Sequence, residues 1–176
     1  MTIIINDKNR KTKLTDRDAW QTPPYLFWWL NQRYKFSIDA AASDAHHLCY
    51  HYFTKEKSLF TATMIDHTVF CNPLYSRGMK KKFLDHLRKQ MKNNTTSVLV
   101  LPNLPSEGWF PHDATTIISI IGRVNFVNPD TGEPSTDVTA GTCVAVFDPL
   151  FYGQTTNLVI HRSDILELYN NRTTTL

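Results

Sequence analysis

The chain has no apolar run long enough to cross a membrane, and its first residues do not predict a signal peptide. Internal repeats and low-complexity linkers are also missing. Cysteine is scarce: Cys49, Cys71 and Cys143 lack the spacing of a metal site, and two of them lie in apolar, strand-like runs. We therefore expect buried free thiols in the reducing cytoplasm of a bacterial host cell, rather than disulfides or a metal-ligating domain.

The chain is long enough for a single globular domain. It has 176 residues, of which 41% are hydrophobic, so it can bury one ordinary core. We predict one compact domain over residues 16–170, with uncommitted polar tails at 1–15 and 171–176. Histidines His46, His47, His51 and His67 lack the spacing and the neighbouring carboxylates of a metal site, so no metal is expected.

Hydrophobic patterning predicts an α/β fold. Helices are expected over 23–33, opened by two prolines, and over 79–92, where apolar residues recur every four positions. Strands are expected at 36–39, 48–53, 69–71, 97–101, 117–126 and 142–147. Alternating strands and helices imply a mostly parallel sheet covered on both faces, and the last two strands form a C-terminal antiparallel hairpin with an extended tip.

The motif Asn72-Pro73-Leu74-Tyr75 directly follows the apolar run 68–71. The amino nitrogen of adenine is a poor nucleophile because its lone pair is delocalised into the ring. The side-chain oxygen of Asn72 and the carbonyl of Pro73 can each accept one of its N–H bonds, while Tyr75 stacks on the base. The other interpretation is an ordinary turn after a strand, since Asn and Pro both favour turns.

Asp39 ends an earlier predicted strand, as Asn72 does. Ligands of parallel sheets bind outside the carboxyl ends of the strands, so these two residues can share one cleft. The alternative for Asp39 is a helix N-cap.

A basic stretch follows the motif. One acid, Asp85, accompanies the cations Arg77, Lys80, Lys81, Lys82, Arg88, Lys89 and Lys92. A run of this kind is often only a solvated helix face, but its position beside the motif favours contacts to phosphates. Arg123 could reach a phosphate or pair with a buried acid, and the sequence leaves both open.

Several ordered features now occur together between about residues 18 and 148. They are Asp18-x-Trp20-x-Thr22-Pro23, Asp39-Ala40-Ala41-Ala42-Ser43, Tyr52-Phe53-Thr54, Phe70-Cys71-Asn72-Pro73, Leu101-Pro102, Trp109-Phe110, Gly122-Arg123-x-x-Phe126 and Gly141-Thr142. As an ordered set they closely resemble the Dam-type DNA N6-adenine methyltransferases of bacteriophages and prophages. The resemblance implies a Rossmann-like class I methyltransferase fold that binds S-adenosylmethionine and methylates adenine N6 in double-stranded DNA, at a short palindrome such as GATC.

The same resemblance implies roles for individual residues. Thr22 and Pro23 match the segment that touches the methionine part of the cofactor. Residues 39–43 match the first cofactor loop, with Asp39 near the methionine ammonium and Ala40 and Ala41 close to the cofactor. Glu56 is the acid available for the ribose hydroxyls. The DNA contacts would come from Arg77, Lys80, Lys81, Lys82 and Arg123.

The sequence departs from the family pattern at three places. Leu74 replaces the usual second proline of the tetrapeptide, the cofactor loop has no glycine, and Lys57-Ser58 stands where further acids are common. We expect activity to survive the first change, because the side chain and N–H at that position take no part in the chemistry. The rival functions are amino-group methylation of cytosine N4 or of a protein amide, and an inactive methyltransferase fold that only binds DNA. Oligomeric state and biological purpose cannot be predicted from these residues.

Overall fold

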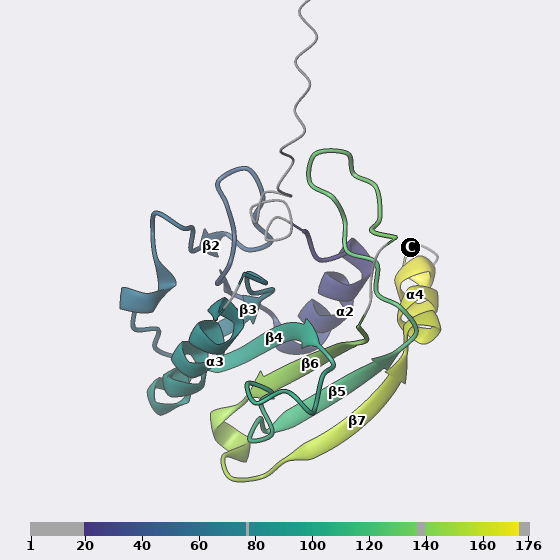
Figure 1. The fold of residues 1–176 in the computed structure, drawn as a ribbon. Coiled ribbons are helices and arrows are strands. Elements are labelled where there is room, and N and C mark those ends of the chain that lie inside the picture. Colours follow the sequence, from purple (N-terminus) through teal and green to yellow (C-terminus); the bar gives the residue numbers. More distant parts are fainter. Residues whose placement is uncertain (1–19, 77, 137–139, 173–176) are drawn as a thin grey trace, which may run out of the picture.

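A single seven-stranded sheet organises the chain (Figure 1). The computed structural model describes residues 20–76, 78–136 and 140–172. The strand order is β2-β1-β3-β4-β6-β5-β7. The strands are β1 (Ile38–Asp39), β2 (His51–Tyr52), β3 (Thr68–Cys71), β4 (Thr96–Pro102), β5 (Thr116–Ile121), β6 (Thr142–Phe147) and β7 (Thr156–His161). The α-helices are α2 (Pro24–Tyr34), α3 (Met79–Lys89) and α4 (Arg162–Asn171).

The sheet is mostly parallel, as the patterning predicts. Strands β2, β1, β3 and β4 pair in parallel, and β5 pairs in parallel with β7. Only β6 runs against its neighbours, pairing with both β4 and β5. The predicted antiparallel hairpin is therefore confirmed, with Ile118 opposite Val144. It is not the last unit of the fold, because β7 and α4 follow it.

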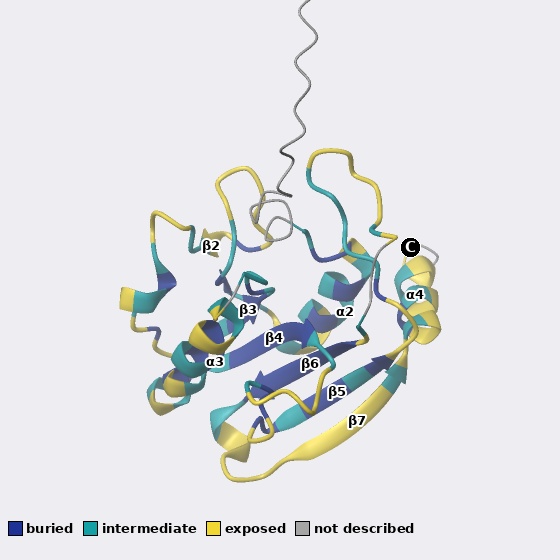
Figure 2. Cartoon of the chain, in the orientation of Figure 1, coloured by how far each residue is buried: buried dark blue, intermediate teal, exposed yellow. Residues whose placement is uncertain are grey.

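Helices cover both faces of the sheet, and β3 shows why. Val69 and Cys71 are buried on the side of α3, while Phe70 between them is buried on the side of α2. This is the alternation expected of a strand that is covered on both faces. Ile165 of α4 joins the cluster on the α2 side. Figure 2 shows the result: the central strands β4 and β6 are buried along their length, whereas β7 is exposed.

Local residues set the ends of α2 and α3. Helix α2 begins at Pro24 and ends at Tyr34. The next residue, Lys35, caps the helix in a left-handed conformation, and the Asn31 side chain accepts the Phe36 N–H at 2.8 Å. Helix α3 begins after Gly78, which is also left-handed, at φ 81°. The helix predicted over 79–92 ends as an α-helix at Lys89 and continues as a 3₁₀ turn, η2 (Gln90–Asn93).

Three predicted strands are shorter in the structure, and one region was missed. The strand predicted at 36–39 is reduced to Ile38–Asp39, and the one predicted at 117–126 ends at Ile121. The strand predicted at 48–53 is reduced to His51–Tyr52, and the stretch from 40 to 67 otherwise contains only the 3₁₀ turn η1 (Leu59–Thr61). Strand β7 and helix α4 had not been predicted, because β7 is an exposed edge strand and α4 buries only Ile165. The predicted N-terminal tail lies outside the described residues, as does the predicted C-terminal tail beyond residue 172. Among the helices of the described ranges, none has the length and apolar character needed to span a bilayer.

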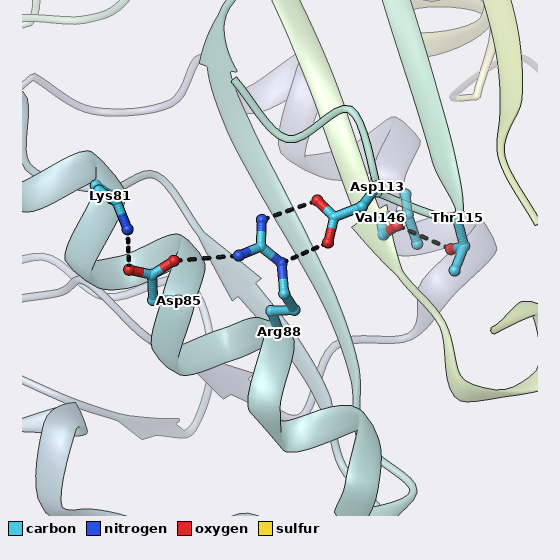
Figure 3. Close-up of polar contacts among 6 residues, drawn as sticks. All are labelled: Lys81, Asp85, Arg88, Asp113, Thr115 and Val146. Atoms are coloured by element: carbon cyan, nitrogen blue, oxygen red, sulfur yellow. Dashed lines mark hydrogen bonds and ion pairs between the residues drawn. The ribbon is translucent and has the colours of Figure 1, made fainter. Parts of the chain in front are cut away.

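An ion-pair network ties α3 to the loop before β5 (Figure 3). Arg88 Nη2 donates to Oδ1 of Asp113 at 2.8 Å, and Arg88 Nε lies 2.8 Å from Oδ2 of the same carboxylate as an ion pair. Its Nη1 lies 3.1 Å from Asp85, which also pairs with Lys81 at 2.5 Å. Two positions later, the Thr115 hydroxyl donates to the Val146 carbonyl at 2.8 Å. The pairing therefore fixes α3 relative to the β5–β6 hairpin, and it removes Arg88 from the cations available to DNA.

Replacing Arg88 with methionine is expected to lower the free energy of unfolding by about 1 kcal/mol, because a bidentate pair is lost but both partners stay partly in water. Thermal unfolding of Arg88→Met, Asp113→Asn and the double variant measures this. The double variant should be little worse than either single one. Additive losses would show that the two side chains do not act as a pair.

Candidate active site

The carboxyl ends of β1 and β3 open into one cleft. The two strands are neighbours, and Ala40, just after β1, donates its N–H to the carbonyl of Phe70 at 2.8 Å. A cavity of about 1050 Å³ lies at this edge of the sheet. Asp39 and Asn72 both line this cavity, in agreement with the prediction from their positions at the ends of two parallel strands. Of the other predicted site residues, Thr22 and Ala41 also line it.

The carboxamide of Asn72 is held in one orientation. Its Nδ2 donates to the backbone carbonyl of Trp20 at 3.0 Å. A carbonyl oxygen can only accept, so the NH₂ group must face Trp20 and the amide oxygen must face the other way. On that side the Tyr75 hydroxyl donates to Oδ1 at 3.4 Å. Asn72 therefore presents an oriented acceptor at the end of β3.

The Trp20 carbonyl is itself anchored by the next residue. Gln21 and Val127 form a β-bridge, with N–H to carbonyl bonds of 2.9 Å in both directions. Val127 begins a loop that returns to bridge with Pro134. Val127 also lines the cleft. The position of Asn72 thus depends on two segments that are far from it in sequence.

Tyr75 lies beside the cleft rather than in its wall. Its ring contacts the edge of Phe126 at 6.4 Å between centroids, and its hydroxyl points at Asn72. Burial raises the pKa of Tyr75 well above its usual range, so the phenol stays protonated and can donate. The adjoining Pro73 is buried and fixes the turn between the two residues.

Asp39 is a buried carboxylate at the floor of the cleft. It is 4% exposed, and its oxygens accept the N–H groups of Ala41 at 3.2 Å and Leu48 at 3.0 Å. Desolvation raises the pKa of Asp39, and these two backbone hydrogen bonds oppose that rise. No helix begins directly after Asp39, since the first helical turn in the fully described stretch from 40 to 67 is η1 at Leu59–Thr61, so the N-cap alternative is wrong. The side chain instead holds both ends of the loop that forms one cleft wall.

Two further polar groups of the cleft wall lack partners. The Thr22 hydroxyl and Gln21 Nε2 are buried, and neither has a hydrogen-bond partner among the described residues. Both residues line the same cleft as Asp39. Buried polar groups are nearly always paired, so these two atoms mark a place for a polar ligand. Pro23 is the buried N-cap residue of α2, and Ala40 is buried directly after β1; neither of them lines the cleft.

The structure separates Glu56 from the other predicted cofactor residues. Glu56 is exposed and does not line the cleft, whereas its neighbour Lys55 does. Sequence reasoning missed Lys55, and it also missed Trp20, Gln21 and Val127 as cleft residues. Trp20 acts on Asn72 through its backbone, which leaves no signal in a residue pattern. Across residues 20–76, 78–136 and 140–172, no cluster of His, Cys, Asp or Glu side chains could hold a metal ion.

The predicted DNA-contacting cations differ in their surroundings. Lys81 pairs with Asp85, and Lys82 is exposed with its ammonium 4.0 Å from the centre of the Phe60 ring. Lys80 turns back toward Tyr75 and donates to its carbonyl at 3.4 Å. Arg123 is exposed after the left-handed Gly122, and no buried acid of the described residues pairs with it. Arg77 lies outside the described residues.

Comparison with known proteins places the chain among DNA methyltransferases. The family model described as DNA N-6-adenine-methyltransferase (Dam) matches residues 9–170, which include the cleft and all seven strands. A protein of Haemophilus phage HP1 (strain HP1c1), named DNA N-6-adenine-methyltransferase, is 28% identical over 144 residues. That match covers 78% of this chain and 83% of the relative.

Proposed function

Because the chain belongs to the DNA N-6-adenine-methyltransferase (Dam) family, and is thus an adenine-specific DNA methyltransferase, we propose that it transfers the methyl group of S-adenosylmethionine to N6 of an adenine turned out of double-stranded DNA. The observation that supports this most directly is the oriented Asn72 amide beside the cleft. A base inside a duplex cannot reach such a group, so the reaction requires base flipping.

The cleft fits S-adenosylmethionine. Its volume of about 1050 Å³ is at the upper end of the range for ligand sites, about 300–1,000 Å³. Asp39 offers an acceptor for the α-ammonium of a methionine group. The unpaired Thr22 hydroxyl and Gln21 Nε2 offer donors for its carboxylate. When bound, the cofactor supplies an electrophilic methyl group on a sulfonium.

The chain itself orients and polarises the target amino group. Asn72 Oδ1 and the Pro73 carbonyl accept its two N–H bonds and aim the nitrogen lone pair outward. Tyr75 positions the base by stacking and supports Oδ1 with its hydroxyl. Lys81, Lys82, Arg123 and Arg77 would contact the DNA backbone, and Glu56 would reach the ribose hydroxyls only if its loop folds toward the cleft. GATC is the proposed recognition sequence, by resemblance.

The decisive experiment is incorporation of labelled methyl groups into unmethylated DNA, followed by mass analysis of the nucleosides. N6-methyladenosine is the expected product, and N4-methylcytosine would instead support the cytosine alternative. Digestion with nucleases sensitive to methylation at GATC then tests the site. A folded protein that shows no binding to S-adenosylmethionine in a calorimetric titration would support the inactive, DNA-binding alternative.

Affinity for S-adenosylmethionine is expected to weaken as pH falls. The loss should begin at a higher pH than it would for an aspartate with an ordinary pKa. The carboxylate of Asp39 must be charged to hold an ammonium, and desolvation raises its pKa above the usual 3.8. The folded protein takes up this proton before the unfolded chain does. The group's contribution to stability therefore rises as pH falls through the same window, opposite to its effect on affinity.

Calorimetric titration between about pH 8 and about pH 5 tests this, with the pH dependence of unfolding measured in parallel. Asp39→Asn serves as the control, because it has no charge to lose in this range. Equal pH dependence of affinity in the two proteins would exclude Asp39 as the titrating group.

A further inference from the structure

We propose that Trp109 is a second wall of the pocket that receives the extruded base, and that the Lys80 ammonium occupies this pocket in the DNA-free enzyme until the base displaces it to the DNA backbone. The inference rests on the proposed function and gives Trp109 and Lys80 specific places in it. Lys80 was predicted only as a contact to DNA, and Trp109 only as part of a family pattern.

One cation lies over the faces of two aromatic rings. Lys80 Nζ is 5.4 Å from the ring centre of Tyr75 and 5.5 Å from that of Trp109. It also donates to the Tyr75 carbonyl at 3.4 Å. The two rings belong to the loops after β3 and β4, which are parallel neighbours, so both lie at the edge where Asn72 presents its amide. The ammonium therefore stands at the face of the ring on which the base is expected to stack.

Stability alone does not account for this position of Lys80. The residue is half-buried, yet no carboxylate of the described residues lies within ion-pair distance of it. Lys81, its neighbour in sequence, does have such a partner in Asp85. Lys80 also lies in the first turn of α3, where the helix dipole disfavours a cation. Contacts to the rings and one carbonyl offset part of these costs, and they are contacts that another flat, polarisable group can replace.

A purine suits the space that the ammonium holds. The Tyr75 hydroxyl points at Asn72 Oδ1 from 3.4 Å. A purine lying over this ring, with its amino group at the hydroxyl end, would bring N6 to that oxygen. Trp109 faces the same space and is held by packing against the core and by Phe110, at 6.1 Å between ring centres. The displaced ammonium has three N–H donors, which suit phosphate oxygens.

The first experiment changes Trp109 and compares methyl transfer with base extrusion. Trp109→Ala is expected to lower kcat/KM for DNA about tenfold or more, as loss of a stacking ring does, with cofactor affinity unchanged. Trp109→Phe keeps a ring and should stay within about threefold of wild type. A duplex with fluorescent 2-aminopurine at the target position reports base extrusion separately, because stacking on a ring quenches the fluorescence of the extruded base. Quenching should weaken with alanine, where Tyr75 is left to stack on one face of the base, and should be stronger with phenylalanine than with alanine.

The second experiment removes the charge of Lys80 in Lys80→Met, with Lys35→Met, an exposed lysine after α2 and outside the basic stretch, as control. On a duplex that contains adenine, the plot of log affinity against log salt should become less steep by about the amount expected for one lost phosphate contact. On an adenine-free G·C duplex the slope should not change, because no adenine displaces the ammonium. Lys35→Met should behave as wild type on both duplexes.

The outcomes separate the inference from the proposed function. A wild-type enzyme that leaves adenine unmethylated overturns the proposed function, and this inference with it. An active wild type with an equally active and equally quenched Trp109→Ala overturns the role of Trp109 alone. A Lys80→Met that loses affinity equally on both duplexes, or on neither, overturns the displacement of Lys80.

Discussion

Asn72→Asp is expected to lose methyl transfer almost as completely as Asn72→Ala. In this chain the side chain must donate an N–H to the Trp20 carbonyl, 3.0 Å away. A carboxylate has only acceptors, so it would be repelled from that carbonyl and leave its position beside Tyr75. We expect single-turnover rates about 100- to 1,000-fold below wild type for both variants, as when one oriented polar group of an active site is removed.

The two variants can be checked against loss of the fold. Asn72→Ala also leaves the Trp20 carbonyl and the Tyr75 hydroxyl without their partner, which costs about 1–3 kcal/mol of stability if they remain buried. Asp39 is untouched, so calorimetric cofactor affinity should be close to wild type in both. An aspartate variant with near wild-type turnover would show that the Trp20 contact does not orient the catalytic group.

Removing the carboxylate of Asp39 is expected to have the largest effect on cofactor binding. Asp39→Ala deletes the only acceptor proposed for the ammonium, and it leaves the N–H groups of Ala41 and Leu48 without theirs. We expect affinity for S-adenosylmethionine to fall about 100-fold or more, and the free energy of unfolding to fall by about 2–3 kcal/mol. Both effects arise from one side chain, because it carries the charge and also shapes the wall.

Two comparisons separate these effects. Asp39→Asn keeps the size and one acceptor, so it should lose affinity more than stability. Asp44→Asn is a control on the same loop: Asp44 is exposed, and its one described bond accepts the Tyr52 hydroxyl at 3.1 Å. Calorimetric titration and thermal unfolding measure both properties. Full cofactor affinity in Asp39→Ala would remove Asp39 from the cofactor site.

The sequence predicted the positions of Asp39 and Asn72 well, because each follows an apolar strand and parallel strands end at one edge. It could not predict the partner of Asn72, since any residue can supply the backbone carbonyl that Trp20 offers. Whether Glu56 or its neighbour Lys55 lines the cleft depends on the path of a loop, and residue types alone do not determine that path. Likewise, the pairing of Arg88 with Asp113 joins segments that only the folded sheet brings together.

The bridge between Gln21 and Val127 has a consequence for how the enzyme is made. Asn72 is aimed by Trp20, whose neighbour Gln21 is held by a residue that the ribosome adds much later. A nascent chain that has not yet reached Val127 therefore contains the catalytic tetrapeptide but lacks the Gln21–Val127 bridge, which holds the Trp20 carbonyl that orients Asn72. The catalytic geometry therefore depends on a segment that is synthesised well after the tetrapeptide, so premature termination upstream of Val127 yields a silent product rather than a weakened enzyme.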